Sequence, residues 1–185
     1  MSKITRFGDS AFNAEEHARI SARSLAVVQK MESALGENSD DMQVYFHEDF
    51  RWRGNFGSGT KRGIAEFRRN WQLPLRAAFT ERDYVTDRFL ADGENVSCFG
   101  HIEATHSGPF MGIAATGKRV TIPYMDFWHV RDGKISENWV SVDLASVLAQ
   151  LGTDIFGGNG WETYDRREKI PPAPQLGASN MSEGV

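Results

Sequence analysis

Hydrophobic residues near the start of the chain recur at the three- and four-residue spacing of a helix. Four of them form one apolar stripe: Leu25, Val28, Met31 and Leu35. Asn13 followed by Glu16 resembles a capping box, and Gly36 is a natural helix stop. The pattern therefore predicts a helix from about residue 13 to 35.

Two further helices are predicted before residue 80. Asp40 is a suitable N-cap for a short helix that runs through Val44 to Phe46. Gly63 to Phe79 has a helical apolar pattern, but Pro74 lies inside it. Because proline removes a backbone donor and crowds the preceding turn, we expect this third helix to be broken or kinked there.

After residue 79 the period changes to the alternation of strands, in four ranges: 84–90, 96–106, 119–130 and 135–142. Asp92-Gly93 and Asp132-Gly133 lie between apolar runs and indicate hairpin turns. Residues 144–151 suit one more short helix, with Asp143 as its cap. The order predicts an α+β fold, in which three N-terminal helices cover one face of a curved antiparallel sheet of four to six strands.

The organisation expected is one domain over residues 13–152, between an N-terminal extension, 1–12, and a Gly/Pro-rich tail, 153–185. Glycine and proline in the tail disfavour regular structure. Trp161 and Tyr164 are suited to anchor it on the domain or on a partner subunit, and a free tail is the alternative.

Alternation places one carboxylate on an apolar face of the predicted sheet. Asp126 shares its side of the strand with Tyr124 and Trp128, and His106 ends the apolar side of the strand before it. If Asp132-Gly133 is a two-residue turn, Asp126 lies opposite Trp139. A carboxylate in such a pocket has a raised pKa and can act as an acid or base.

The opposite face of the same strand also carries apolar residues. Met125 and Phe127 alternate with Tyr124, Asp126 and Trp128. The opposite parity therefore stays open, and a sheet covered on both faces, the second one in a subunit interface, is an alternative.

Composition and motifs narrow the function classes. The formal net charge is -4, with no basic tract, so neither a nucleic acid nor an anionic membrane is an expected partner. One cysteine excludes an internal disulfide and a cysteine-built zinc site. His101 and Glu103 share a face opposite to His106, so no metal site is expected. There is no phosphate-binding loop and no GxSxG motif.

Targeting signals are also missing from the sequence. There is no run of 18 apolar residues that predicts a transmembrane helix, and the first twenty residues lack the apolar core of a signal peptide. We therefore expect a cytoplasmic protein.

Three stretches carry a family resemblance: ATHSGPFMGIAATGKRV, DFWHVRDGKISENW, and Asp143 with the closing LAQLG. Over roughly residues 20–152 the chain resembles the SnoaL-like polyketide cyclases of the nuclear-transport-factor-two-like superfamily. The resemblance implies a cone-shaped fold, in which helices wrap a curved sheet around an apolar pocket. It also implies a homodimer, which is common in the family.

The resemblance also implies roles for individual residues. In the characterised cyclases an aspartate on the third long strand is the acid/base of a cofactor-free aldol closure, and its position here is Asp126. The family histidine two residues earlier is replaced by Tyr124, and the histidine of the ATHSG segment is His106. Tyr124 also argues against the limonene epoxide hydrolase branch, which has an arginine at that position.

The function expected is a cofactor-independent cyclase, isomerase or dehydratase acting on a hydrophobic carbonyl compound. Asp126 would remove a proton next to the carbonyl, while Tyr124 or His106 would stabilise the enolate oxygen. Four further residues are expected to contact the substrate: Trp52, Asn55, Trp128 and Trp139. The alternative is a non-catalytic small-molecule-binding or dimerisation module, with its pocket filled or with Asp126 locked by hydrogen bonds.

Overall fold

The first helix has the predicted bounds. The computed structural model describes residues 13–37, 41–55 and 57–169, and the chain divides into two compact units, at Thr153 and Asp154. Helix α1 spans Ala14–Gly36, and the Asn13 side chain caps it by accepting hydrogen bonds from two backbone N–H groups of the first turn. The helix and its cap are confirmed.

The second predicted helix is only one 3₁₀ turn, η1, Gln43–Tyr45, and Phe46 already begins a strand. Asp40, its expected cap, lies outside the described residues. The third helix has three consecutive parts: α2, Gly63–Phe67; η2, Arg68–Gln72; and α3, Leu73–Ala78. The part η2 is a π-helical turn that ends two residues before Pro74, so the irregularity expected at the proline is a widened turn rather than a break.

Six strands form one sheet in the order β2-β1-β6-β5-β4-β3. Their bounds are β1, Phe46–Gly54; β2, Thr60–Arg62; β3, Phe79–Asp92; β4, Asn95–His106; β5, Arg119–Arg131; and β6, Lys134–Val142. The α+β fold is confirmed. The sheet is mixed, because β1 runs parallel to β6 while all other pairs are antiparallel.

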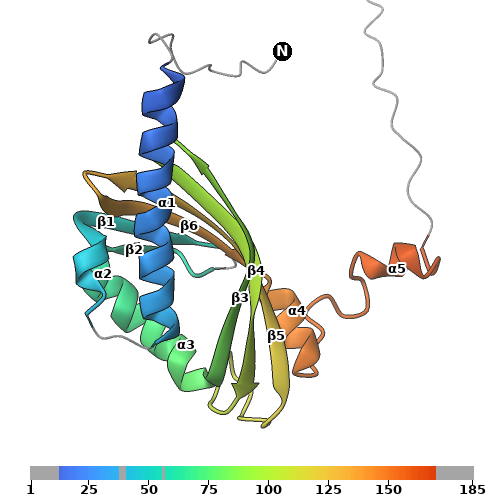
Figure 1. Cartoon of the computed structure of the whole chain (residues 1–185). Helices are drawn as coiled ribbons and strands as arrows, with labels where there is room; N and C mark the ends of the chain where they lie inside the picture. Colours follow the sequence, from blue (N-terminus) through green and yellow to red (C-terminus); the bar gives the residue numbers. More distant parts are fainter. Residues whose placement is uncertain (1–12, 38–40, 56, 170–185) are drawn as a thin grey trace, which may run out of the picture. The chain divides into compact units, whose positions relative to one another are not determined.

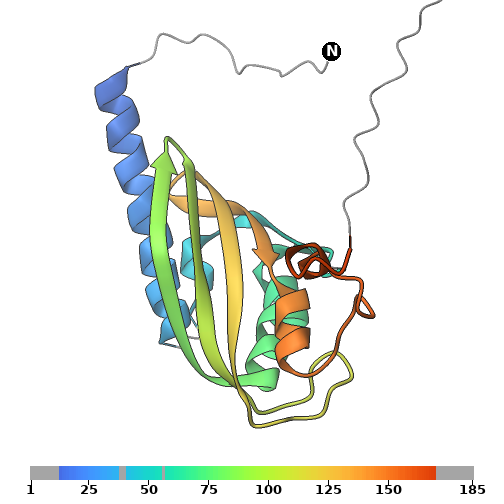
Figure 2. The same cartoon turned by 90° about the vertical axis from the view of Figure 1, so that its right-hand side faces the viewer.

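Helices cover one face of this curved sheet. Figure 1 shows α1 crossing in front of the strands, and Figure 2 shows how β3, β4 and β5 bend together. Helix α1 packs on β3 and β4, while α2 packs on β1. The last helix of this unit, α4, spans Leu144–Gln150, and the Asp143 side chain caps it by accepting from the backbone of Ser146 at 2.9 Å. None of the helices in the described ranges is long and apolar enough to cross a membrane.

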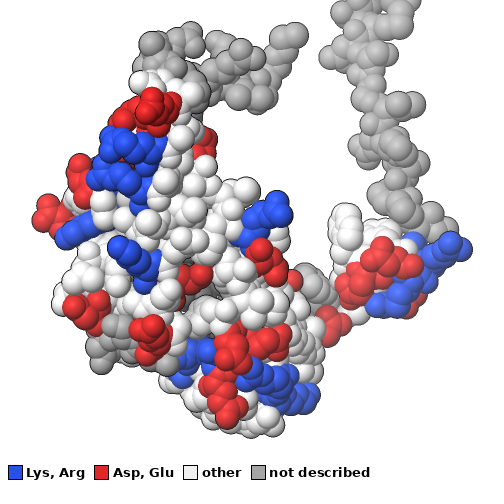
Figure 3. Space-filling view, viewed as in Figure 1, with Lys and Arg blue, Asp and Glu red and all other residues white. Residues whose placement is uncertain are grey.

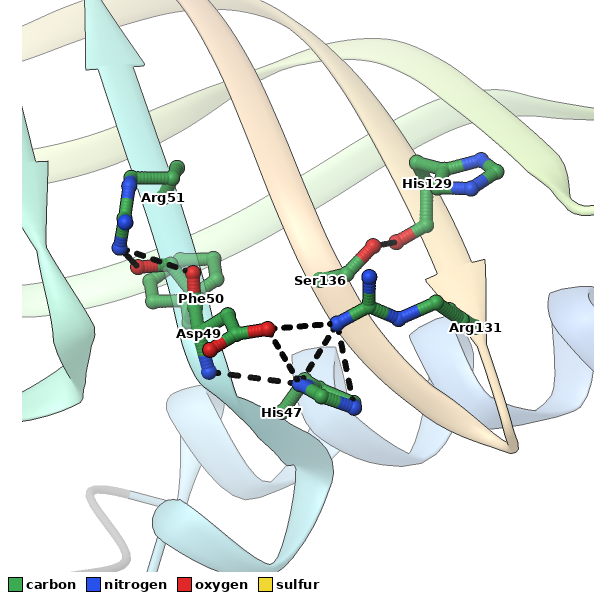
Figure 4. A network of polar contacts seen from close by, with 7 residues as sticks. All are labelled: His47, Asp49, Phe50, Arg51, His129, Arg131 and Ser136. Atoms are coloured by element: carbon green, nitrogen blue, oxygen red, sulfur yellow. Dashed lines mark hydrogen bonds and ion pairs between the residues drawn. The ribbon is translucent and has the colours of Figure 1, made fainter.

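A β-bulge in β6 changes the register that the turn sets. Arg131 pairs with Lys134 as predicted, but His129 pairs with Glu137 because Ser136 is an extra residue. The Ser136 hydroxyl donates to the backbone carbonyl of His129 at 3.1 Å (Figure 4). The predicted pairing of Asp126 with Trp139 is therefore wrong by one residue, and Asp126 lies opposite Val140.

Strand β1 has a wider irregularity between Phe46 and Arg51. A polar cluster holds it against the β5–β6 hairpin: Arg131 donates to the Asp49 carboxylate at 3.0 Å and to the ring of His47 at 2.9 Å (Figure 4). After this irregularity Trp52 is fully buried on the inner face. The sequence did not predict β1, because its apolar residues do not alternate regularly.

In the described part of the second unit, residues 154–169, there is one short helix, α5, Glu162–Asp165, so the expectation that the tail has no regular structure is wrong there. The Thr163 hydroxyl donates to the carbonyl of Gly160 at 2.8 Å, and the rings of Trp161 and Tyr164 lie 5.3 Å apart. Local contacts of this kind suffice for a single turn. The anchoring of the tail on the domain stays a prediction.

Candidate functional site

A cavity lies between the inner face of the sheet, α1 and the η2 turn. It contains about 770 Å³ of space free of protein atoms, including the part open to solvent. Most of its wall is apolar, and Met31, Trp71 and Ile102 come from a helix, the π turn and β4. Six polar or titratable side chains also line it: Glu32, Gln72, Tyr84, Tyr124, Asp126 and Asn138. An apolar pocket with a few polar groups is the usual form of a small-molecule site.

Asp126 lies on the inner face of β5 and is half-buried, with part of its surface facing the cavity. The pKa of its carboxyl group is raised to about 7, mainly by burial and in smaller part by the negative charge of Glu32. A hydrogen bond from the Asn138 side chain to Oδ1, 2.8 Å long, lowers the pKa in part. A group that titrates near neutral pH can both take and return a proton.

Asn138 is a site residue that the sequence reasoning missed. The expected two-residue turn without a bulge placed Asn138 on the outer face, whereas the extra residue Ser136 turns it inward, opposite Trp128. No simple sequence signal marks the bulge, since the turn residues themselves are regular. Its consequence is a donor placed directly beside the Asp126 carboxylate.

Trp139 is on the outer face of the sheet instead of in the pocket wall. Its ring packs against Phe127, with centroids 5.6 Å apart, and the Arg53 guanidinium lies 5.5 Å from its centroid. The expected role of Trp139 in the pocket is therefore wrong, and the bulge is the reason.

Asn55 is also outside the cavity lining. Its amide donates to the hydroxyl of Ser141 at 3.0 Å and accepts from the backbone of Val142 at 3.2 Å. These two bonds fasten the end of β1 to β6. They give Asn55 a structural position in place of the expected contact with substrate.

His106 does not join Asp126. It is fully buried at the end of β4, packs on Phe79 and Phe110, and its Nδ1 lies 3.0 Å from the hydroxyl of Thr116. Asp126 pairs with Cys98, eight residues earlier on the same strand, which corresponds to roughly 26 Å along it. His106 is not one of the described residues that line the cavity.

Tyr124 and Glu32 belong to one hydrogen-bonded chain at the cavity. The hydroxyl of Thr86 donates to the carboxylate of Glu32 at 2.8 Å and lies 2.8 Å from the hydroxyl of Tyr124. Burial raises the pKa of Glu32 and that of Tyr124. Glu32 was not predicted from the sequence because it lies on α1 beside the apolar stripe. An acidic residue in that position is typical of the solvent-exposed side of a helix.

Two of the predicted aromatic walls line the cavity. Trp52 and Trp128 are both buried, and Trp52 stacks on Trp71 with centroids 4.5 Å apart. Gln72, on the π turn, also lines the cavity; it is buried, and its amide nitrogen has no hydrogen-bond partner among the residues described. Buried polar groups are normally paired, so an unpaired donor in the wall of the cavity is unusual.

Neither metal-binding nor thiol chemistry is indicated in the described part of the chain. No cluster of His, Cys, Asp and Glu there has the arrangement to hold a metal ion. Burial raises the pKa of the Cys98 thiol, so it stays protonated. On the face that Figure 3 shows, acidic and basic side chains are interspersed.

Comparison with known proteins gives a family and a fold. The family model described as SnoaL-like polyketide cyclase matches residues 26–151. No significant match was found among curated proteins.

Solved structures share the fold at low sequence identity. A candidate SnoaL-like polyketide cyclase from Jannaschia sp. CCS1 is 19% identical with a TM-score of 0.65, covering 72% of this chain and 94% of that one. AclR, a candidate hydroxylase from Streptomyces galilaeus, is 22% identical with a TM-score of 0.63, covering 71% and 97%. IdmH, a candidate polyketide cyclase from Streptomyces antibioticus, is 23% identical with a TM-score of 0.61, covering 70% and 99%.

Proposed function

The chain belongs to the SnoaL-like polyketide cyclase family, and on that premise we propose that it is a cofactor-independent enzyme that moves a proton on a hydrophobic carbonyl compound. Cyclisation, isomerisation and dehydration all begin with such a step. The observation that carries the proposal is the Asp126 carboxyl group, with a pKa near neutral, at the wall of an apolar cavity. The family binds small hydrophobic molecules, and the aromatic walls of the cavity suit them.

The proposed reaction uses three groups of the cavity. Ionised Asp126 removes a proton from the carbon next to the carbonyl, while Asn138 holds Oδ1 and leaves Oδ2 to take the proton. The hydroxyl of Tyr124 donates to the carbonyl oxygen as negative charge develops on it. Asp126 then returns the proton elsewhere on the substrate, so no proton is consumed. The free amide of Gln72 is placed to hold a second oxygen of the substrate.

Hydrogen exchange tests the proton-abstraction step without knowledge of the natural substrate. The probe is 2-tetralone, a bicyclic aromatic ketone, whose hydrogens next to the carbonyl exchange for deuterium in D₂O and are followed by proton NMR. We expect the wild-type protein to accelerate the exchange and Asp126→Asn to lose about 100-fold or more of that acceleration. Asp143→Asn, at the cap of α4, is the matched control. No acceleration by the wild type, or an unchanged rate in Asp126→Asn, overturns the proposal.

A non-catalytic binding module is the second candidate. The bond from Asn138 to Asp126 favours it, because a buried carboxylate with a fixed partner is also a stable structural element. For a module, 2-tetralone would bind without exchange, and Asp126→Asn would leave that binding unchanged.

We also propose that a second copy of the chain covers the outer face of the sheet, which would make the homodimer implied by the family resemblance. Six large apolar side chains are exposed there: Val85, Leu90, Phe99, Met125, Phe127 and Trp139. Exposed apolar patches of this kind mark association surfaces. Light scattering after size exclusion is expected to show a dimer that Met125→Glu converts to monomer, while Val44→Glu, on η1, does not. A monomeric wild type or a dimer that survives Met125→Glu contradicts this.

A further inference from the structure

The chain Glu32–Thr86–Tyr124 has a direction that depends on one proton. The threonine hydroxyl has a single hydrogen, and an ionised carboxylate can only accept. While Glu32 is ionised, the hydrogen of Thr86 is therefore donated to it, over 2.8 Å. The oxygen of Thr86 is then an acceptor, and Tyr124, 2.8 Å away, must donate its own hydrogen to it.

Protonation of Glu32 allows the chain to reverse. A carboxylic acid has a hydrogen to donate, so Glu32 can donate to Thr86 and Thr86 can donate to the oxygen of Tyr124. The hydrogen of Tyr124 is then released from the chain and can point to a molecule in the cavity that Tyr124 lines.

We propose that Glu32 is a positioning residue that controls, through Thr86, whether Tyr124 donates to the bound molecule or to the protein. Only the catalytic meaning of this control rests on the proposed function; the direction of the chain does not. Glu32 borders both the inner cavity and an outer groove with Arg82, Asp83 and Tyr84. The groove gives its carboxyl group a route for proton exchange with water.

Burial is the main influence on the titration of Glu32, and several charged groups lie around it. Burial raises its pKa, and the bond from Thr86 lowers it in part. Asp126 shares the cavity, and each carboxylate makes the ionisation of the other less favourable. Arg82 and Asp83 on β3 line the outer groove beside Glu32 and carry opposite charges. The competent state has Asp126 ionised and Glu32 protonated. Because the charge of Glu32 also raises the pKa of Asp126, this state is one of two arrangements of a single proton shared by the two carboxyl groups, and the pH dependence belongs to the pair.

Tyrosine labelled with ¹³C at Cζ reports the direction of the chain without any substrate. The Tyr124 signal is assigned with Tyr124→Phe and followed through the titration of the carboxyl groups; Tyr124 itself stays neutral because burial raises its pKa. We expect the signal to move in the wild type as Glu32 ionises, and this movement to vanish in Glu32→Gln.

Thr86→Val and Thr86→Ser separate the hydrogen bond from the electric field. Valine has nearly the shape of threonine and keeps both carboxylates, whereas serine keeps the hydroxyl. The movement of the Tyr124 signal should persist in Thr86→Ser and be largely lost in Thr86→Val. Equal movement in both variants means that Glu32 acts through its field alone, and no movement in the wild type means that it does not act on Tyr124; either result overturns the proposal.

Exchange of 2-tetralone then tests the consequence for activity. In the wild type and Thr86→Ser the rate should rise with the first ionisation of the pair. It should fall about 100-fold with the second ionisation, when Tyr124 donates to Thr86 again. In Thr86→Val the fall should be largely lost. If exchange is absent while the NMR movement is present, the proposed function is wrong, but the hydrogen-bonded chain from Glu32 to Tyr124 is supported. If exchange depends on Asp126 but its pH profile is the same in Thr86→Val and Thr86→Ser, the hydrogen-bonded chain has no part in the exchange.

Discussion

On each face of β5 and β6 a few side chains differ in polarity from their surroundings, polar ones on the inner face and apolar ones on the outer face. On the inner face Asp126, Tyr124 and Asn138 are polar groups in apolar surroundings, and each has a hydrogen-bond partner. On the outer face Phe127 and Trp139 are apolar and exposed, and pack on each other. The polar groups inside are paired and oriented, as a binding site requires, while the apolar groups outside are exposed, which is the composition of the association surface proposed above.

A single inserted residue decides which side chain belongs to which face. Ser136 moves Asn138 inward beside Asp126 and Trp139 outward. Without this bulge Trp139 would lie opposite Asp126, and the carboxylate would have a bulky ring in place of a donor. The bulge is therefore part of the site, although Ser136 itself does not line the cavity.

Truncation of one tryptophan on each face is expected to give the largest difference in stability. Trp52→Ala removes a fully buried ring and is expected to lower the free energy of unfolding by about 3–5 kcal/mol. Trp139→Ala removes a partly exposed ring and is expected to cost about 1 kcal/mol, a small effect that is usual away from the core. Urea unfolding followed by circular dichroism measures both; equal losses would mean that the outer face is as well packed as the inner one.

On the inner face, the raised pKa of Asp126 predicts that the free energy of unfolding depends on pH. Because the pKa of Asp126 is raised from 3.8 to about 7 on folding, the native state holds a proton that the unfolded state has lost between these values. Stability contributed by this group is present below pH 3.8 and is lost as pH rises to about 7. Asp126→Asn has no carboxyl group to titrate. Between pH 3.8 and about 7 its free energy of unfolding should therefore rise relative to that of the wild type, by at most about 4 kcal/mol. Urea titrations at several pH values measure it, and a difference that does not vary with pH contradicts a raised pKa.

The smallest effect concerns the bulge itself. Ser136→Ala removes the bond to the carbonyl of His129 and is expected to cost about 1 kcal/mol in the same unfolding experiment. Ser97→Ala, on the outer face of β4, is the comparison and should cost less. If Ser136→Ala has no effect, the hydroxyl does not hold the bulge.

The sequence predicted much of the fold because its periodicity and turns are local signals. Asn13 and Asp143 cap helices as expected, and the hairpin at Asp132-Gly133 begins in the expected register. The bulge at Ser136 and the irregular strand β1 were not predictable, because tertiary contacts such as the Arg131–Asp49 pair stabilise them. Asp126 was found as an acid on an apolar face.

The partners of the site residues required the structure. Asn138 reaches Asp126 only through the bulge, and Glu32 and Thr86 meet Tyr124 from separate elements far apart in the chain. Alternation along one strand cannot show such contacts. It also placed His106 on the correct face of β4 but gave no measure of its distance from Asp126.

The titration of Asp126 is the decisive measurement for the proposed proton transfer. Protein labelled with ¹³C at Cγ of aspartate is titrated by NMR, and Asp126→Asn assigns the signal. We predict a pKa of about 7, and a further rise in Asn138→Leu, because the amide stabilises the ionised form. An Asp126 signal that titrates near 4 in the wild type would show an ordinary solvated carboxylate and contradict the proposed proton transfer.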